Sequence, residues 1–498
     1  MTWCKHHWVT IATWISVFAG VLLRLRQYLI GRSLWLDEAL LALNILQRTF
    51  LQLTQPLDYS QGAPLLFLWT EKLLTELIGN GENVLRLLPF LSGLFALFLF
   101  PLIASKYQSP RAALWGTILF AFADPLIWYA SEIKQYSGDV LATLLALALF
   151  LTLVQKRLRT SDAILLAMAG VLLIWASHSA IFTLVSAALI AFLVRFHQGD
   201  RQQLFVVLAV GAIWSGGFLM SLIFSLDNLA GNQILLNFWK IGFPPQTGGA
   251  LAFLEWFQQR FLDLFVETLD ITLVAVAIIL YLVGIVVMAR RNGPFALSLV
   301  LPVVFVLAAA VLNRYPFFGR LLIFLFPLIL ILIAEGLDRL LIWPEDRRYL
   351  QVAGSLILLV FLAPQVVEGL SYVSSPKYRE DIAPAIQYVY ENKLPNDPVY
   401  IYYSSRIPFF YYKERYPIAD DSVILGVYSR DDWEAYGREM EELAQKHTRL
   451  WLIFSHVHTG GGGNEEEIIL NSLTELGAQE QESIILEGAS AHLYTIPP

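Results

Sequence analysis

The chain has 498 residues, of which 57% are hydrophobic and 15% charged, and its formal net charge is -7. Soluble domains carry about 25% charged residues, so this composition indicates a membrane protein, and the lack of a basic face excludes a nucleic-acid reader. Cys4 is the only cysteine, which excludes a disulfide framework or a cysteine metal site within one chain.

Apolar stretches long enough to cross a bilayer recur from the N-terminus to about Leu370. The first, from Trp8 to about Tyr28, lacks a small-residue cleavage site and predicts a retained signal anchor. The pattern predicts about eleven transmembrane helices, near residues 8–28, 85–104, 111–130, 139–155, 162–177, 179–195, 204–225, 269–289, 295–312, 320–337 and 350–370.

Basic residues gather in loops on one side of these helices, as at Lys156–Arg159 and Arg290–Arg291. The positive-inside rule makes these loops cytoplasmic, with a cytoplasmic N-terminus and an extracytoplasmic C-terminal part. Arg24, Arg26 and Arg32, near the outer end of the first helix, run against this bias. The predicted outer loops are 31–84, 131–138, 226–268 and 313–319.

The segment Pro64–Ile78 is apolar at its start but carries charged residues at one-turn spacing. If it crossed the bilayer, every later basic loop would change sides. We therefore expect a helix at the membrane surface, within the first outer loop of a membrane domain spanning residues 1–370.

The remainder, residues 371–498, is polar and predicts a small α/β domain. Helices are predicted near 379–393, 432–446 and 465–476, and strands near 398–403, 422–427, 449–455, 482–487 and 491–496. No Gly-Lys-Ser/Thr follows Gly460–Gly463, so these glycines indicate a flexible loop instead of a phosphate loop.

Two adjacent acids, Asp37 and Glu38, follow the outer end of the first helix. One interpretation is structural, with Asp37 capping a helix that starts at Ala39 and Glu38 in its first turn. The other is catalytic, because a carboxylate at the lipid–water boundary can take a proton from an attacking acceptor. Both can hold together.

Several cations stand on the predicted outer side, against the positive-inside bias. They are Arg86, Lys134, Arg314 and Arg320. Each can reach the lipid headgroups by itself, whereas several together indicate a phosphate site.

Three histidines could have a chemical or a structural role. His178, between two closely spaced helices, is either a proton carrier or a helix-end residue bonded to a carbonyl. His456 and His458 alternate as metal ligands on a strand do, but no third ligand accompanies them.

The chain resembles the GT-C type membrane glycosyltransferases over about residues 8–340, in particular bacterial members of glycosyltransferase family 39. These are related to the protein mannosyltransferases and the lipid A aminoarabinose transferase. The resemblance rests on the order of five motifs: Trp35-Leu-Asp-Glu, Gln61-Gly-Ala-Pro-Leu-Leu-Phe-Leu-Trp, Arg86-Leu-Leu-Pro-Phe-Leu-Ser-Gly, Ser131-Glu-Ile-Lys-Gln-Tyr and Gly319-Arg-Leu-Leu-Ile-Phe-Leu-Phe-Pro.

The resemblance implies an inverting hexosyl or pentosyl transferase of the plasma (inner) membrane. Its donor would be a polyprenyl-phosphate sugar, and its acceptor a lipid, glycan or protein. Asp37 would be the catalytic base, with Glu38 shaping the acceptor site. The expected donor-binding residues are Lys134, Tyr136 and Arg320, joined by Arg86, Glu132 and Arg314. Some relatives bind a divalent metal; the outer loops show no evident ligand cluster, so none is assigned although one is possible.

Two other functions stay open. A transporter or lipid flippase would place charges and broken helices at the bilayer midplane. A non-catalytic envelope scaffold would bind a partner through the α/β domain and tolerate the loss of Asp37.

Overall fold

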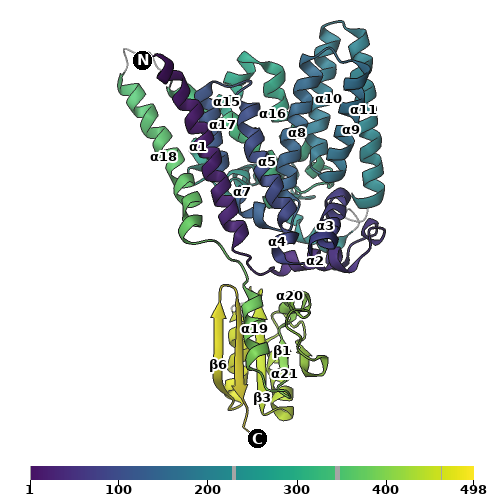
Figure 1. The fold of residues 1–498 in the computed structure, drawn as a ribbon, viewed down its shortest axis with the longest axis vertical. Helices are drawn as coiled ribbons and strands as arrows, with labels where there is room; N and C mark the ends of the chain where they lie inside the picture. The colour runs from purple at the N-terminus through teal and green to yellow at the C-terminus, as the bar shows by residue number, and fades with distance from the viewer. Residues whose placement is uncertain (1, 227–231, 342–347, 461–462, 498) are drawn as a thin grey trace. The chain divides into compact units, whose positions relative to one another are not determined.

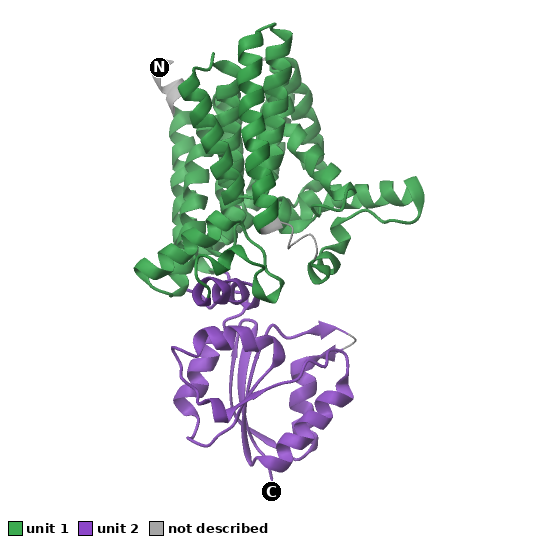
Figure 2. Ribbon diagram, turned by 90° about the vertical axis from the view of Figure 1, so that its right-hand side faces the viewer, with its two compact units in different colours: residues 1–30, 48–376 green, residues 31–47, 377–498 purple. Residues whose placement is uncertain are grey.

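The computed structural model describes residues 2–226, 232–341, 348–460 and 463–497. The chain divides into two compact units, coloured separately in Figure 2. The helical unit comprises Met1–Ile30 and Arg48–Pro376, and the α/β unit comprises Gly31–Gln47 and Lys377–Pro498. The segment with Asp37 and Glu38 therefore belongs to the same unit as the C-terminal sheet. The last membrane helix continues to Ser374, past the expected boundary at 370.

Every predicted membrane segment corresponds to an apolar helix of the helical unit, which confirms the polytopic fold (Figure 1). Within the described residues, nine helices are long enough to span a bilayer. They are α1 (Thr2–Leu29), α5 (Leu87–Ala104), α8 (Tyr136–Gln155), α10 (Ala180–His197), α11 (Arg201–Ser221) with η4 (Leu222–Leu226), α15 (Val274–Arg291), α16 (Gly293–Val311), η7 (Gly319–Leu325) with α17 (Phe326–Leu341), and α18 (Arg348–Ser374).

Two predicted segments have a different form. The segment near 111–130 is a pair bent by 58°, made of α6 (Pro110–Phe122) and then α7 (Asp124–Trp128) with η3 (Tyr129–Ser131). Pro125 has no backbone N–H to continue the hydrogen bonds of α6, so the chain bends there. The segment near 162–177 is the shorter α9 (Thr160–Ala176).

Short helices join these long ones. After α1 and the α/β-unit segment come η1 (Gln52–Thr54), η2 (Asp58–Ser60), α3 (Leu65–Ile78) and α4 (Glu82–Leu85). Before α15 come α13 (Gln233–Phe238), η5 (Lys240–Gly242), α14 (Gly249–Asp263) and η6 (Leu264–Thr268). The segment Pro64–Ile78 is thus helical as predicted. The helix α3 within it has 14 residues, too few to count among the spanning helices.

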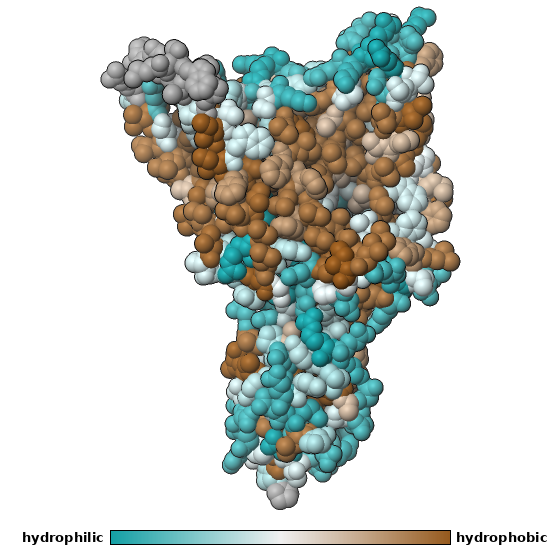
Figure 3. Space-filling view, viewed as in Figure 1, coloured by the Kyte–Doolittle hydropathy of each residue, from teal (hydrophilic) through white to brown (hydrophobic). Residues whose placement is uncertain are grey.

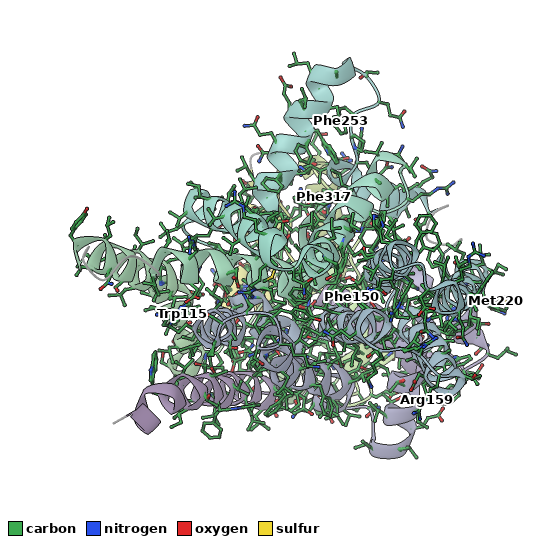
Figure 4. All side chains as sticks on the ribbon, turned by 90° about the horizontal axis from the view of Figure 1, so that it is seen from above. Trp115, Phe150, Arg159, Met220, Phe253 and Phe317 are labelled. Atoms are coloured by element: carbon green, nitrogen blue, oxygen red, sulfur yellow. The ribbon has the colours of Figure 1, made fainter. Side chains whose placement is uncertain are left out.

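The helical unit is apolar on its flanks and packed inside. Figure 3 shows hydrophobic side chains over the visible flank of the helices. Seen from above in Figure 4, Phe150 lies among the helices and Met220 lies at the periphery, in agreement with their burial and exposure. A Cβ atom at Gly284 of α15 or at Gly336 of α17 would collide with the other helix's backbone, so glycine permits this close approach.

Arg24 of α1, which seemed to oppose the charge bias, is fully buried in the helical unit. Its guanidinium donates to the carbonyls of Ala121 at 2.9 Å and Phe120 at 3.1 Å. Those carbonyls lie at the end of α6, where the bend leaves them without helical partners. Arg24 therefore serves the bend in the α6–α7 pair and is not a topology signal.

Glu71 of α3 is a buried acid whose two carboxyl oxygens have no hydrogen-bond partner among the described residues. Burial raises the pKa of this carboxyl well above its ordinary value of 4.5. The folded chain therefore keeps a proton that the unfolded chain releases above pH 4.5. Stability is greatest below that pH and falls as pH rises toward the folded pKa.

We expect Glu71→Gln to remove this part of the pH dependence, which amounts to about 1 kcal/mol per pH unit. The measurement is the unfolding midpoint of detergent-solubilised protein at several pH values between 5 and 8. Glu76→Gln, an exposed acid on the same helix, is the matched control and should keep the wild-type slope. If the stability of Glu71→Gln changes with pH as steeply as that of wild type, Glu71 is not protonated in the folded protein.

The α/β unit contains a five-stranded sheet of order β2-β1-β3-β7-β6. Its strands are β1 (Val399–Ile401), β2 (Val423–Leu425), β3 (Arg449–Ser455), β6 (Gln479–Leu486) and β7 (Ala489–Thr495). The first three are parallel, and β7 and β6 are antiparallel additions. β4 (Thr459–Gly460) and β5 (Gly463–Asn464) pair where a flexible loop was predicted, and residues 461–462 lie outside the described residues.

Helices cover both faces of this sheet. Along β3, Trp451 and Ile453 enter one core while Leu450, Leu452 and Phe454 enter the other. This explains why residues 450–454 of β3 are all apolar instead of alternating with polar residues. The first core contains residues of α19 (Ile382–Asn392) and α20 (Arg406–Tyr412), and the second contains residues of α21 (Trp433–Lys446) and α22 (Glu465–Glu475).

Two local predictions were wrong. The helix expected from Ala39 begins earlier, as α2 (Leu36–Gln47), so Asp37 lies in its first turn and is not its cap. The short helix α20 was missed, because Pro408 and its aromatic neighbours are poor helix formers. Apart from β4 and β5, which were not predicted, the other α-helices and strands of this unit lie where they were predicted, within a few residues.

Candidate functional site

The acid pair lies at the start of α2, in the α/β unit. Asp37 is half-buried, whereas Glu38 is fully buried. The Arg32 guanidinium donates to Glu38 Oε2 at 3.2 Å, and both side chains are shielded from solvent. Asp37 is the more exposed of the two acids, although its Oδ2 atom is buried. Arg32, like Arg24, is buried and donates to an acceptor inside the fold.

In the helical unit, Arg320 and Tyr136 come together as the motifs led us to expect. The Arg320 guanidinium carbon is 5.7 Å from the centre of the Tyr136 ring and 5.6 Å from that of Trp239. Tyr136 in turn meets Tyr129 edge to face, with ring centres 5.0 Å apart. A guanidinium near aromatic rings is attracted to their faces, and its planar fork can bind a phosphate in a bidentate way.

Backbone geometry places Arg320 in this position. Gly319 adopts a φ of +56°, a left-handed conformation natural to glycine, and η7 starts there. The Thr268 hydroxyl donates to the Gly319 carbonyl at 3.0 Å and fixes the turn. Trp239, which ends α13, was not singled out from the sequence, because nothing local links it to a residue eighty positions away.

Lys134 is buried, and its ammonium donates to Gln61 Oε1 at 2.8 Å. Gln61 opens the Gln61-Gly-Ala-Pro motif and lies on the wall of a small pocket. Two family-like motifs, distant in sequence, therefore meet at this hydrogen bond. The pocket is lined by Leu53, Gln55, Pro56, Leu57, Gln61, Gly62, Ala63, Leu65, Leu68, Phe224 and Asn232.

The other expected binding residues have different surroundings. Arg86, between α4 and α5, is buried. Glu132 is also buried, and it accepts from the Trp128 indole at 2.5 Å. Arg314 is exposed, in the loop between α16 and η7. Glu132 thus supports the turn that carries Lys134, and Arg314 is the more accessible cation.

The histidines do not form a metal site. His178 is in the loop between α9 and α10, where burial lowers its pKa to about 4, so it is neutral at neutral pH. β3 ends at Ser455, and His456 adopts a φ of +51°, so the strand-like alternation with His458 is broken. Their acidic neighbours also differ, Glu380 for His456 and Asp431 for His458. Among the described residues no three His, Cys, Asp or Glu side chains form a metal-binding group.

No protein-family model and no curated protein sequence matches the chain. Solved structures do match it. ArnT from Cupriavidus metallidurans, in the apo state, is 14% identical with a TM-score of 0.52, covering 98% of each chain. The Archaeoglobus fulgidus oligosaccharyltransferase, in the apo form, is 13% identical with a TM-score of 0.54, covering 91% of this chain and 70% of its own.

Two further matches carry ligands according to their descriptions. ArnT from Cupriavidus metallidurans bound to undecaprenyl phosphate is 14% identical, covers 98% of each chain and has a TM-score of 0.50. The Archaeoglobus fulgidus oligosaccharyltransferase complex with Zn and sulfate is 14% identical, covers 88% of this chain and 67% of its own, and has a TM-score of 0.51. At such identities the likeness concerns the fold, and it confirms the resemblance to which the motifs pointed: the chain has the fold of the GT-C membrane glycosyltransferases.

Proposed function

We propose that this protein is an inverting glycosyltransferase, which moves a sugar from a polyprenyl phosphate to an acceptor outside the cytoplasm. The observation that carries the proposal is the match to ArnT over 98% of both chains. The same fold was solved with undecaprenyl phosphate bound in that protein. The helical unit supplies the cations Arg320 and Lys134 and the ring of Tyr136, and the α/β unit supplies the acid Asp37.

In the proposed reaction, the bond between the sugar's anomeric carbon and the phosphate oxygen breaks. A new bond forms from that carbon to the acceptor's oxygen or nitrogen. Asp37 takes the acceptor's proton, and the polyprenyl phosphate leaves as an anion. One displacement inverts the anomeric carbon. No metal takes part in these assigned roles.

The donor phosphate is assigned to Arg320 and Lys134. Arg320 lies near two aromatic rings, and Lys134 donates to Gln61. The departing phosphate gains negative charge during the reaction, so fixed cations stabilise the transition state more than the ground state. Arg314 would assist from the surface, and Arg86 and Glu132 would support the turns behind these cations.

The pocket beside Gln61 is assigned to the donor's first isoprene units or sugar. Its walls are mostly leucine, proline and phenylalanine, with the amides of Gln55, Gln61 and Asn232 among them. An apolar wall with a few amides fits a molecule that joins a hydrocarbon to a polar head.

A transporter is less well supported by the buried charges. Glu335 and Asp338 of α17 pair with Arg291 and Arg111, in the last two turns of the helix and beside loops predicted to be cytoplasmic. Asp139 lies in the first turn of α8 and accepts from Ser177 at 2.5 Å. These described charges stand near helix ends, whereas transport sites lie near the midplane.

The proposal is tested by supplying purified protein with a panel of polyprenyl-phosphate sugars and a membrane extract, and following the label of the sugar. Transfer from at least one donor is expected. Folded protein that binds no lipid-linked sugar and transfers none would overturn the proposal and favour a transporter or a scaffold.

We also propose that the α/β unit lies outside the cytoplasm, since the basic loops mark the opposite side. A reporter enzyme that is active only outside the cytoplasm should be active when fused after Pro498. The same reporter fused after Arg291, in a loop predicted to be cytoplasmic, should be silent. The reverse pattern would refute this orientation.

A further inference from the structure

The segment that precedes Asp37 is bound by side chains from the far end of the chain. Leu34 N donates to the Tyr412 hydroxyl at 2.8 Å, and Leu36 N donates to Glu380 Oε2 at 3.0 Å. Leu36 is the first residue of α2, and the first amides of a helix have no partner within it. Glu380 and Tyr412 thus supply acceptors that the helix itself lacks.

Ser33 is held in the same way. Its hydroxyl donates to Asp381 Oδ1 at 2.5 Å and accepts from Ala383 N at 3.0 Å. Trp35 is buried, with the Arg379 guanidinium 3.6 Å from its ring centre. Four consecutive residues before Asp37 are therefore engaged, three of them in an irregular segment and the fourth at the start of α2.

The residues that hold this segment are themselves fixed to the sheet. Asp381 N donates to the carbonyl of Glu487, in the turn between β6 and β7. Glu380 Oε1 lies 2.6 Å from His456 Nδ1, directly after β3. His456 has a φ of +51°, which residues other than glycine rarely adopt. The backbone bends there to bring the imidazole to Glu380.

In open α/β sheets the crevice beyond the carboxyl ends of parallel strands is the usual ligand site. Here His456 stands at the carboxyl end of β3, and its ring centre is 6.3 Å from that of Trp35. The chain's own residues 33–36 thus lie beside this edge, where another α/β domain would bind a small molecule.

We propose that the α/β domain holds the catalytic acid in position. Four of its residues position α2 and hence Asp37: Glu380, Asp381, Tyr412 and His456, here named the loop clamp. These are positioning residues, and the inference rests on the proposed role of Asp37 as base. The chain connects α2 to membrane helices on both sides, so the acid can be held by the domain and still belong to the first outer loop.

The test uses the full-length protein in detergent and two independent readouts. The first is hydrogen exchange of peptides covering residues 33–47, which needs no activity. The second is the kinetics of sugar transfer, with kcat and KM for the donor measured separately. The variants are Tyr412→Phe, which removes one hydroxyl, and Glu380→Ala with its conservative partner Glu380→Gln.

We expect Tyr412→Phe and Glu380→Ala to raise exchange in residues 33–47 and to lower kcat by about tenfold or more, with KM for the donor little changed. Glu380→Gln should recover most of the loss, because its amide oxygen can still accept from Leu36 N. Tyr390→Phe and Glu441→Ala, on exposed helix surfaces of the same domain, are the controls and should match wild type.

The outcomes separate the two proposals. Wild-type exchange and kcat in both Tyr412→Phe and Glu380→Ala, in a protein that transfers sugar, would overturn the clamp alone. If wild type transfers no sugar, the catalytic proposal fails, while the exchange readout still shows whether these residues hold α2. If Glu380→Ala also raises hydrogen exchange in β1 and β3, that variant has unfolded the domain. The exchange and kcat of Tyr412→Phe then decide whether the loop clamp positions α2.

Discussion

Asp37→Asn is expected to lower kcat for sugar transfer by about 10²–10⁴-fold while leaving donor binding nearly unchanged. Asparagine has the size of aspartate but cannot accept a proton, so only the step that deprotonates the acceptor suffers. Glu38 cannot substitute for it, because Glu38 is buried in its pair with Arg32. The measurement is label transfer under saturating donor, beside a separate measurement of polyprenyl-phosphate binding.

The matched control is Asp421→Asn, an exposed aspartate of the same unit, which should transfer at the wild-type rate. Acceptors of different pKa sharpen the result, since an acceptor that deprotonates easily should lose less in the variant. Undiminished transfer by Asp37→Asn would show that Asp37 is not the base, even if the protein is a glycosyltransferase.

Arg320→Gln is expected to weaken polyprenyl-phosphate binding by about 10- to 100-fold and to lower kcat/KM at least as much. Hydrogen bonds to charged groups contribute about 1.5–3 kcal/mol, which corresponds to such factors. Arg320→Lys should recover only part of the loss, because lysine keeps the charge but not the planar fork that lies between Tyr136 and Trp239.

Binding should be followed at several salt concentrations with a short-chain polyprenyl phosphate. Arg290→Gln, an exposed arginine in the last turn of α15, is the control and should bind as wild type does. Trp239→Leu should weaken polyprenyl-phosphate binding by less than Arg320→Gln does, because the Arg320 guanidinium still lies near the Tyr136 ring. Equal binding by Arg320→Gln and wild type would remove Arg320 from the donor site.

Membrane helices could be predicted well because a bilayer imposes a local rule. A stretch of about twenty apolar residues is needed to cross it, and such a stretch is visible wherever it occurs. Most strands and helices of the α/β domain were found for a similar reason, since residues 450–454 of β3 are all apolar and α21 has a clear polar face. The exception is α20, whose helix forms although Pro408 and its aromatic neighbours do not favour one.

The charged residues near α1 show the limit of such rules. Arg24 and Arg32 counted as topology signals in the sequence, yet both are used inside the fold, by the carbonyls of α6 and by Glu38. Charge counting treats every arginine as solvent-exposed. Whether an arginine is buried depends on acceptors that other parts of the chain supply.

The candidate site likewise has residues that the sequence indicates and partners that only the structure shows. Asp37, Lys134, Tyr136 and Arg320 were proposed as site residues because motif order and position relative to the helices mark them. Their partners were not, because Glu380 is 344 positions from Leu36 and Gln61 is 73 positions from Lys134. No periodicity connects residues so far apart.

The sequence by itself therefore determined the class of the protein, its membrane segments, the α/β domain and the positions of the acid and the cations, since hydropathy and local motifs encode these. Only the tertiary structure decided that the acid-bearing segment belongs with the C-terminal domain, that Glu38 is paired and buried, and that Arg320 lies near the rings of Tyr136 and Trp239. Burial and hydrogen bonding are properties of neighbours in space, and folding alone makes those neighbours.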